Sequence, residues 1–174
     1  MPKPLVLTSI RFKDGNVIPI AYTGEGEDMS PPLQWENAPA GTKSLALLVE
    51  DPDAPDPRNP QTTWSHWVVY NIPPGARGLT EGATLDVLPA GTLMGMNDWN
   101  RMAYGGPMPP MGSHRYYFRL FALDTMLPDL DRPTRAELLA AMDGHILGEA
   151  SLMGTYEKVH HREHEWRTGE NAHE

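Results

Sequence analysis

Five polar side chains stand where apolar segments of the sequence begin or end. Asp51 and Asp53 follow one apolar run, His66 begins the next, and His114 and Tyr116 open a third. Loops and strand ends held by a rigid scaffold are the usual places for binding and catalytic residues. We therefore take these five residues as the first candidates for chemistry.

Three kinds of chemistry fit an aspartate that accompanies two histidines. Asp51, His66 and His114 could hold a metal ion as a facial triad. They could also act as an acid–base set, as in a hydrolase or cyclase, with the aspartate orienting an imidazole. In a third arrangement, Asp51 raises the pKa of a histidine, while imidazole N–H groups, the Tyr116 hydroxyl and loop amides face a phosphoryl group. The spacing alone does not choose among these.

The sequence argues against covalent catalysis. The chain has no cysteine, which excludes thiolate nucleophiles and thiolate metal ligands. It also lacks the G-x-S-x-G pattern of a serine nucleophile, and the segment GGPMPPMG is not a phosphate loop of the lysine type. A binding or regulatory role is favoured over an enzymatic one, and inhibition of kinases or proteases through the loop 56–64 is a further hypothesis.

The elements that position these residues are predicted to be strands. Short apolar runs alternate with turns that draw on 18 prolines and 16 glycines, a pattern typical of an antiparallel all-β domain. In the run that starts at His66, alternation predicts His66 and Val68 on one face and Trp67 on the other. The expected strands are 5–12, 17–22, 33–35, 44–50, 66–72 and 115–123.

The C-terminal part of the chain has a different pattern. Thr134 and Glu137 form a capping box at the start of a predicted helix, which Gly144 ends. We expect a second short helix at 146–153 and a final strand at 155–157. The polar segment 159–174 is predicted to be a flexible tail.

Length and charge limit the possible roles. The 174 residues suffice for one domain, which we place at 1–158. The 14 basic and 23 acidic residues give a formal charge of −9, so a nucleic acid or an anionic membrane surface is not an expected partner. No segment has the length of a membrane span and the N-terminus has no signal-peptide pattern, so a cytoplasmic location is expected.

Five ordered blocks of the sequence resemble one known family. VEDPDAP, HWVVYNIP, YGGPMPP, GSHRYYFRLFALD and GHILGEASLMGTYEK are similar to segments of the phosphatidylethanolamine-binding protein family, in its bacterial and archaeal Raf-kinase-inhibitor-like branch. The resemblance spans about residues 5–158. It implies a mainly-β sandwich with a large antiparallel sheet, short C-terminal helices and a small pocket for phosphate-like groups, together with a preference for a homodimer.

The resemblance also assigns residues to that pocket. Pro52 and Pro55 hold the two carboxylates, Arg115 braces the neighbouring loop, and neither a cofactor nor a metal is implied. Met108 stands where bacterial members usually have a cysteine, and Asp51–Pro52 and Met108–Pro109 are candidates for cis peptide bonds. The residues expected to bind a small phosphorylated or anionic ligand are Asp51, Asp53, Trp64, His66, Gly106, Pro107, His114 and Tyr116.

Overall fold

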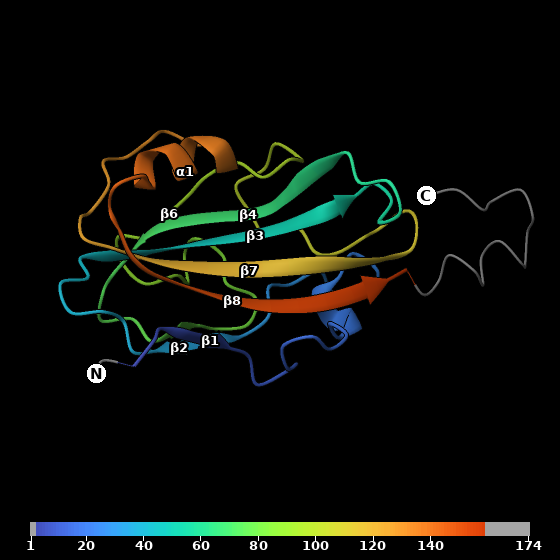
Figure 1. Cartoon of the computed structure of the whole chain (residues 1–174), viewed down its shortest axis with the longest axis horizontal. Coiled ribbons are helices and arrows are strands. Elements are labelled where there is room, and N and C mark those ends of the chain that lie inside the picture. The colour runs from blue at the N-terminus through green and yellow to red at the C-terminus, as the bar shows by residue number, and fades with distance from the viewer. Residues whose placement is uncertain (1–2, 159–174) are drawn as a thin grey trace, which may run out of the picture.

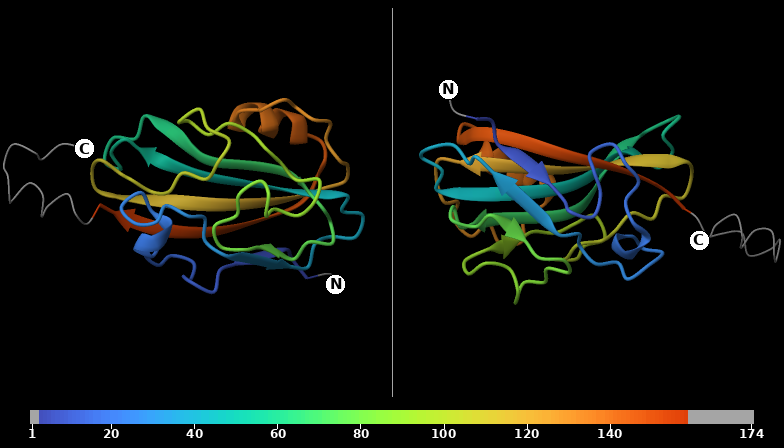
Figure 2. Two further views of the ribbon diagram at one scale, coloured as in Figure 1. Left: turned by 180° about the vertical axis from the view of Figure 1, so that it is seen from behind. Right: turned by 90° about the horizontal axis from the view of Figure 1, so that it is seen from below.

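Two antiparallel sheets lie face to face in the computed structural model, which describes residues 3–158 (Figures 1 and 2). The small sheet has the order β1-β2-β5 and the large sheet the order β6-β4-β3-β7-β8. The predicted mainly-β sandwich with a large antiparallel sheet is thus confirmed. The strands are β1 (Val6–Thr8), β2 (Leu33–Glu36), β3 (Ser44–Ala54), β4 (Thr62–Ile72), β5 (Gly78–Leu79), β6 (Leu93–Met94), β7 (Ser113–Leu123) and β8 (Ile146–Glu157).

The central strands are apolar on both faces because both faces are covered. On the inner face Leu47 and Phe118 pack in the core between the sheets. On the outer face Leu48 and Phe121 pack in a second cluster with Leu138 of α1 (Arg135–Met142). This explains the continuous apolar character of β3 and β7, in which alternation is hard to see.

The helix α1 begins as the sequence predicts. The Thr134 side chain accepts a hydrogen bond from the Glu137 amide, and the Glu137 carboxylate accepts one from the Thr134 amide. Gly144, just beyond the helix, has a φ of 84°, a conformation that favours glycine. No helix in residues 3–158 is long and apolar enough to cross a membrane.

Two predicted elements are wrong. Segment 146–153 is a strand, not a second helix: β8 runs unbroken from Ile146 to Glu157 and pairs with β7 along its length. Pairing with β7 overrides the helix propensity of this segment, and Leu152, Gly154 and Tyr156 are buried at every second position, as in a strand. Segment 17–22 is not a strand, because Pro19 precedes a 3-10 turn, η1 (Ile20–Tyr22). The predicted tail 159–174 lies outside the described residues.

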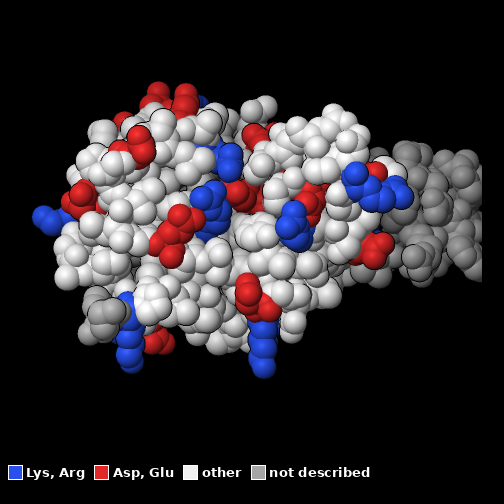
Figure 3. Space-filling view, viewed as in Figure 1, with Lys and Arg blue, Asp and Glu red and all other residues white. Residues whose placement is uncertain are grey.

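An ion-pair cluster covers part of the outer face of the large sheet. The buried Glu50 carboxylate accepts hydrogen bonds from Arg119 at 3.3 Å and from Arg135 at 2.7 Å, which ties α1 to the sheet. Arg119 also pairs with Glu149 at 3.1 Å. On the face drawn in Figure 3, acidic and basic side chains are interspersed, with no broad basic area.

Candidate functional site

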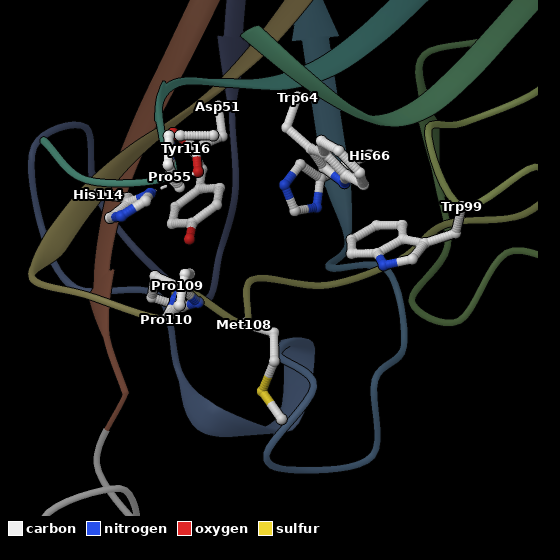
Figure 4. Close-up of a pocket in the computed structure, with 11 residues that line it drawn as sticks. Asp51, Pro55, Trp64, His66, Trp99, Met108, Pro109, Pro110, His114 and Tyr116 are labelled. Carbon is white, nitrogen blue, oxygen red and sulfur yellow. Dashed lines mark hydrogen bonds and ion pairs between the residues drawn. The ribbon is translucent and has the colours of Figure 1, made fainter. Parts of the chain in front are cut away.

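A small cavity lies at one end of the large sheet. Because neighbouring strands are antiparallel, the end of β3 lies beside the starts of β4 and β7, and the polar residues at these three points come together. The cavity has a volume of about 240 Å³ (Figure 4). It is lined by Asp51, Ala54, Pro55, Trp64, His66, Trp99, Met108, Pro109, Pro110, His114 and Tyr116.

Asp51 and His114 form a buried ion pair in the wall of the cavity. The Oδ2 atom of Asp51 lies 2.6 Å from Nδ1 of His114, and both side chains are at most 5% exposed. The other ring nitrogen, Nε2, is 2.7 Å from the carbonyl oxygen of Met111. Since both partners are acceptors, both ring nitrogens must carry protons, and His114 is an imidazolium.

The environment of His114 favours this charged form. Burial by itself lowers the pKa of His114, but the hydrogen bond and the charge of Asp51, with the Met111 carbonyl, outweigh it and raise the pKa above its ordinary value. Both N–H groups of His114 therefore donate to acceptors of the protein itself, the Asp51 carboxylate and the Met111 carbonyl. This differs from the expected pocket in which imidazole N–H groups face a ligand.

A bulge in β4 turns His66 into the cavity. Val49 lies opposite Trp67 but Glu50 lies opposite Ser65, so His66 is an extra residue between two paired positions. Its ring packs edge-on against Tyr116, a residue of the inner core, at 5.3 Å between ring centres. The predicted alternation, with His66 and Val68 on one face, is therefore wrong: Val68 packs in the outer cluster.

His66 is held in a defined tautomer. Its Nδ1 atom lies 2.6 Å from the carbonyl oxygen of Gly105, so Nδ1 carries the proton and donates it. Burial lowers the pKa of His66, against the opposing effect of the Gly105 carbonyl, so the ring is neutral near pH 7. The Nε2 atom makes no hydrogen bond within residues 3–158 and is not enclosed by protein atoms, which leaves it open to the cavity.

Tyr116 lies between the two histidines (Figure 4). Its ring stacks on that of His114 with 6.2 Å between centres, and its hydroxyl has no hydrogen-bond partner in the described part of the chain. Burial raises the pKa of this hydroxyl, which therefore stays protonated and able to donate. The nearby Trp64 indole N–H is buried and also lacks a partner among the described residues.

Asp53 supports the cavity from behind and does not line it. Its Oδ2 atom accepts hydrogen bonds from the backbone amide of Arg115 at 2.9 Å and from Arg115 Nε at 3.0 Å, and Oδ1 accepts one from Nη2 at 2.8 Å. The hydrogen bonds from Arg115 hold the pKa of Asp53 below its usual value, despite the burial of the carboxylate. The pair fixes the start of β7, next to His114.

The predicted loop residues play supporting parts. The Gly106 amide donates to Asp28 at 2.7 Å, and the Pro107 carbonyl accepts from the Gly24 amide at 2.9 Å. Pro55 lines the cavity, whereas Pro52 does not. The cis peptide bond of the described chain is Ala54–Pro55, so neither predicted candidate, Asp51–Pro52 or Met108–Pro109, is cis.

Sequence reasoning missed Trp99 as part of this cavity. Its indole meets His66 edge-on at 5.0 Å and Trp64 at 5.6 Å between ring centres. The Asn97 side chain holds the turn that presents it, by accepting from the Trp99 and Arg101 amides. The only signal in the sequence is an aromatic residue among methionines, which does not reveal its position in the fold.

The three side chains considered for a facial triad do not form one. No group of three or more His, Asp or Glu side chains within residues 3–158 is placed to hold a metal ion. Both nitrogens of His114 are occupied by acceptors, and the Tyr116 ring separates it from His66.

Comparisons with known proteins agree with this architecture. Residues 8–157 match the family model described as phosphatidylethanolamine-binding protein. A UPF0098 protein of Methanothermobacter thermautotrophicus is 47% identical over 148 residues, which cover 84% of this chain and 95% of the relative.

Two solved structures are similar throughout. A putative phosphatidylethanolamine-binding protein homologue from Chlamydia trachomatis is 44% identical, with a TM-score of 0.82 over 90% of this chain and 99% of the other. YbcL of E. coli is 32% identical, also with a TM-score of 0.82, over 90% of this chain and 100% of the other.

Proposed function

The chain belongs to the phosphatidylethanolamine-binding protein family, and we propose that its cavity binds the phosphoryl group, or a similar small anionic group, of a ligand without transforming it. The volume of about 240 Å³ is below the roughly 300–1,000 Å³ of pockets for drug-sized molecules. It suits a single phosphoryl group with a short substituent.

The observation that carries this proposal is a pair of polar atoms that face the cavity and have no hydrogen-bond partner in the described protein. The Tyr116 hydroxyl and His66 Nε2 both open onto the cavity, and neither makes a hydrogen bond within the described chain. Polar atoms that lack a protein partner in a cavity are usually paired with water or with a ligand, so these two atoms are available to a bound anion. The imidazolium of His114 beside them supplies positive charge, while its partner Asp51 is already engaged.

A hydrolase or cyclase that relies on a side-chain nucleophile or on His114 is less well supported by the same geometry. The described residues that line the cavity include no serine, threonine, cysteine or lysine. His114 donates to Asp51 and to the Met111 carbonyl, so neither nitrogen is free to exchange a proton with a substrate.

We propose a further role for the apolar rim of the cavity in assembly. Trp99 and Met108, which line the cavity, are 37% and 40% exposed, and the neighbouring Met111 is 50% exposed; an exposed apolar rim of this kind favours contact with a protein surface. The expected homodimer would use this rim, and sedimentation at several concentrations would reveal it; a monomer at every concentration would contradict it. A kinase or protease remains the alternative protein target.

Replacing Tyr116 with phenylalanine tests the binding proposal. The change removes one hydroxyl that donates to the anion, and we expect about tenfold weaker binding of inorganic phosphate with little change in stability. Binding is measured by calorimetric titration, or by the fluorescence of Trp64 and Trp99, which line the cavity.

Tyr117→Phe is the matched control. This neighbouring tyrosine meets Arg115 at 3.3 Å outside the cavity, so its loss should leave phosphate binding unchanged. The proposal fails if the unaltered protein takes up no phosphate, or if Tyr116→Phe and Tyr117→Phe bind it equally well.

A further inference from the structure

One peptide group joins His66 to an aspartate outside the cavity. The carbonyl oxygen of Gly105 accepts from His66 Nδ1 at 2.6 Å, and the amide of Gly106 donates to Oδ1 of Asp28 at 2.7 Å. These two atoms belong to the same peptide bond. Asp28 is not among the cavity-lining residues, so it acts on the cavity through this peptide.

The peptide decides which nitrogen of His66 carries the proton. A carbonyl oxygen only accepts, so Nδ1 must be the donor, and a neutral imidazole then has a lone pair at Nε2. Rotation of the peptide would break the hydrogen bond to the Asp28 carboxylate, which is of the stronger, charge-assisted kind. Asp28 thereby fixes the carbonyl, and the carbonyl fixes the tautomer.

The surroundings of His66 keep the ring neutral. Burial lowers its pKa, and this outweighs the Gly105 hydrogen bond and the charges of Asp51, Asp98 and Asp28, which act in the opposite direction. The other rings packed against His66 are Trp99 and Tyr116, and neither carries a charge. Nε2 therefore faces the cavity as an acceptor.

An acceptor in an anion site requires a proton on the ligand. Building on the proposed function, we propose that the cavity selects a phosphoryl group that still carries a proton over an oxyanion that carries none, and that Asp28 is the positioning residue behind this selectivity. The P–OH group donates to His66 Nε2, and the Tyr116 hydroxyl donates to another oxygen of the same ligand. An oxyanion without a proton would place one of its lone pairs next to the lone pair of Nε2, and the two would repel each other.

Hydrogen phosphate and sulfate provide the test. At about pH 8 both are tetrahedral dianions, but only hydrogen phosphate has an O–H donor. We expect the full-length protein to bind phosphate about 10- to 100-fold more tightly than sulfate in calorimetric titrations, because an unpaired buried acceptor is costly. If the two affinities were equal, the proposed selectivity would be wrong and the proposed function would stand. If neither anion bound, the selectivity and the proposed function would both be wrong.

Asp28 is tested by removing its carboxylate without straining the backbone. Asp28 has a φ of 59°, which glycine and asparagine tolerate, so Asp28→Gly is the deletion and Asp28→Asn, which keeps an acceptor for the Gly106 amide, is the rescue. We expect the phosphate-to-sulfate preference to fall toward one in Asp28→Gly and to persist in Asp28→Asn. Asp98→Asn is the charge control: Asp98 acts on His66 by its charge but accepts from the Ser65 amide instead of the 105–106 peptide, so the preference should persist in this variant.

Nitrogen-15 NMR of the His66 ring gives a readout that a purely structural role would not change. In the unaltered protein Nδ1 should be protonated and Nε2 unprotonated, whereas in Asp28→Gly both neutral tautomers should be populated. A protonated Nε2 with a bare Nδ1 in the unaltered protein would overturn the proposal, whatever the stability of the variants.

Discussion

Replacing His114 with alanine is expected to lower the free energy of unfolding by about 3–5 kcal/mol and to abolish phosphate binding. The change removes the cation that neutralises Asp51, whose side chain is 5% exposed and whose Oδ2 lies 2.6 Å from the ring. An uncompensated carboxylate is then left inside the protein. Chemical denaturation measures the first effect, and calorimetric titration with inorganic phosphate measures the second.

The chain contains a matched surface pair for comparison. His145 and Asp124 approach to 2.8 Å, but they are 45% and 43% exposed. Water screens such a pair, so His145→Ala should lower stability by no more than about 1 kcal/mol. In the double variant Asp51→Asn/His114→Ala the loss should be smaller than in His114→Ala, because no buried carboxylate remains without a partner. Equal losses for the two single histidine variants would contradict this account of the buried pair.

The effect of His114 also depends on pH. Its pKa is higher in the folded protein than the value of about 6.5 expected when unfolded. The pair's stabilisation is therefore complete below about pH 6.5 and is lost as the pH rises through the folded pKa. The difference in stability between the unaltered protein and His114→Ala should shrink toward alkaline pH, and a constant difference would argue against a charged His114.

Replacing Gly106 with alanine is expected to lower the free energy of unfolding by about 1–3 kcal/mol and to weaken phosphate binding. A Cβ atom here would lie 2.5 Å from the Tyr22 carbonyl oxygen and 2.7 Å from Oδ1 of Asp28, so the backbone must move. That movement would displace the Gly105 carbonyl, which orients His66. Denaturation and phosphate titration measure the two effects.

Gly75→Ala is the control for this substitution. A Cβ atom at Gly75 meets nothing within 4 Å, and its φ is not in the left-handed region. Its stability should match that of the unaltered protein within about 0.5 kcal/mol. If Gly106→Ala were as stable as Gly75→Ala, the close approach at Gly106 would have no energetic consequence.

The sequence predicted the residues of the site better than their orientations. Asp51, His66 and His114 were found because each stands where a strand begins or ends, and antiparallel neighbours bring such points to one end of a sheet. The bulge that turns His66 inward adds one residue to β4, and a pattern of period two carries no sign of it. The Met111 carbonyl opposite His114 belongs to the backbone, so residue types could not reveal it.

The other features of the fold and the site could not be predicted because they depend on residues that are far apart in the sequence. Segment 146–153 contains good helix formers, and only its pairing with β7 makes it a strand. Asp28 and Trp99 lie far along the chain from the residues they contact. Asp28 in particular acts through the 105–106 peptide, so its part in the site becomes visible only with the folded chain.

The two sides of the cavity have separate origins, and this has an evolutionary consequence. The charged side comes from strand ends that the sheet fixes, whereas much of the opposite wall comes from Met108, Pro109 and Pro110 in a connecting loop. Substitutions of these loop side chains can change the shape of the cavity while the Asp51–His114 ion pair stays in place. A change in the group that the cavity accepts would then require only a few substitutions in the loop, with the Asp51–His114 pair unchanged.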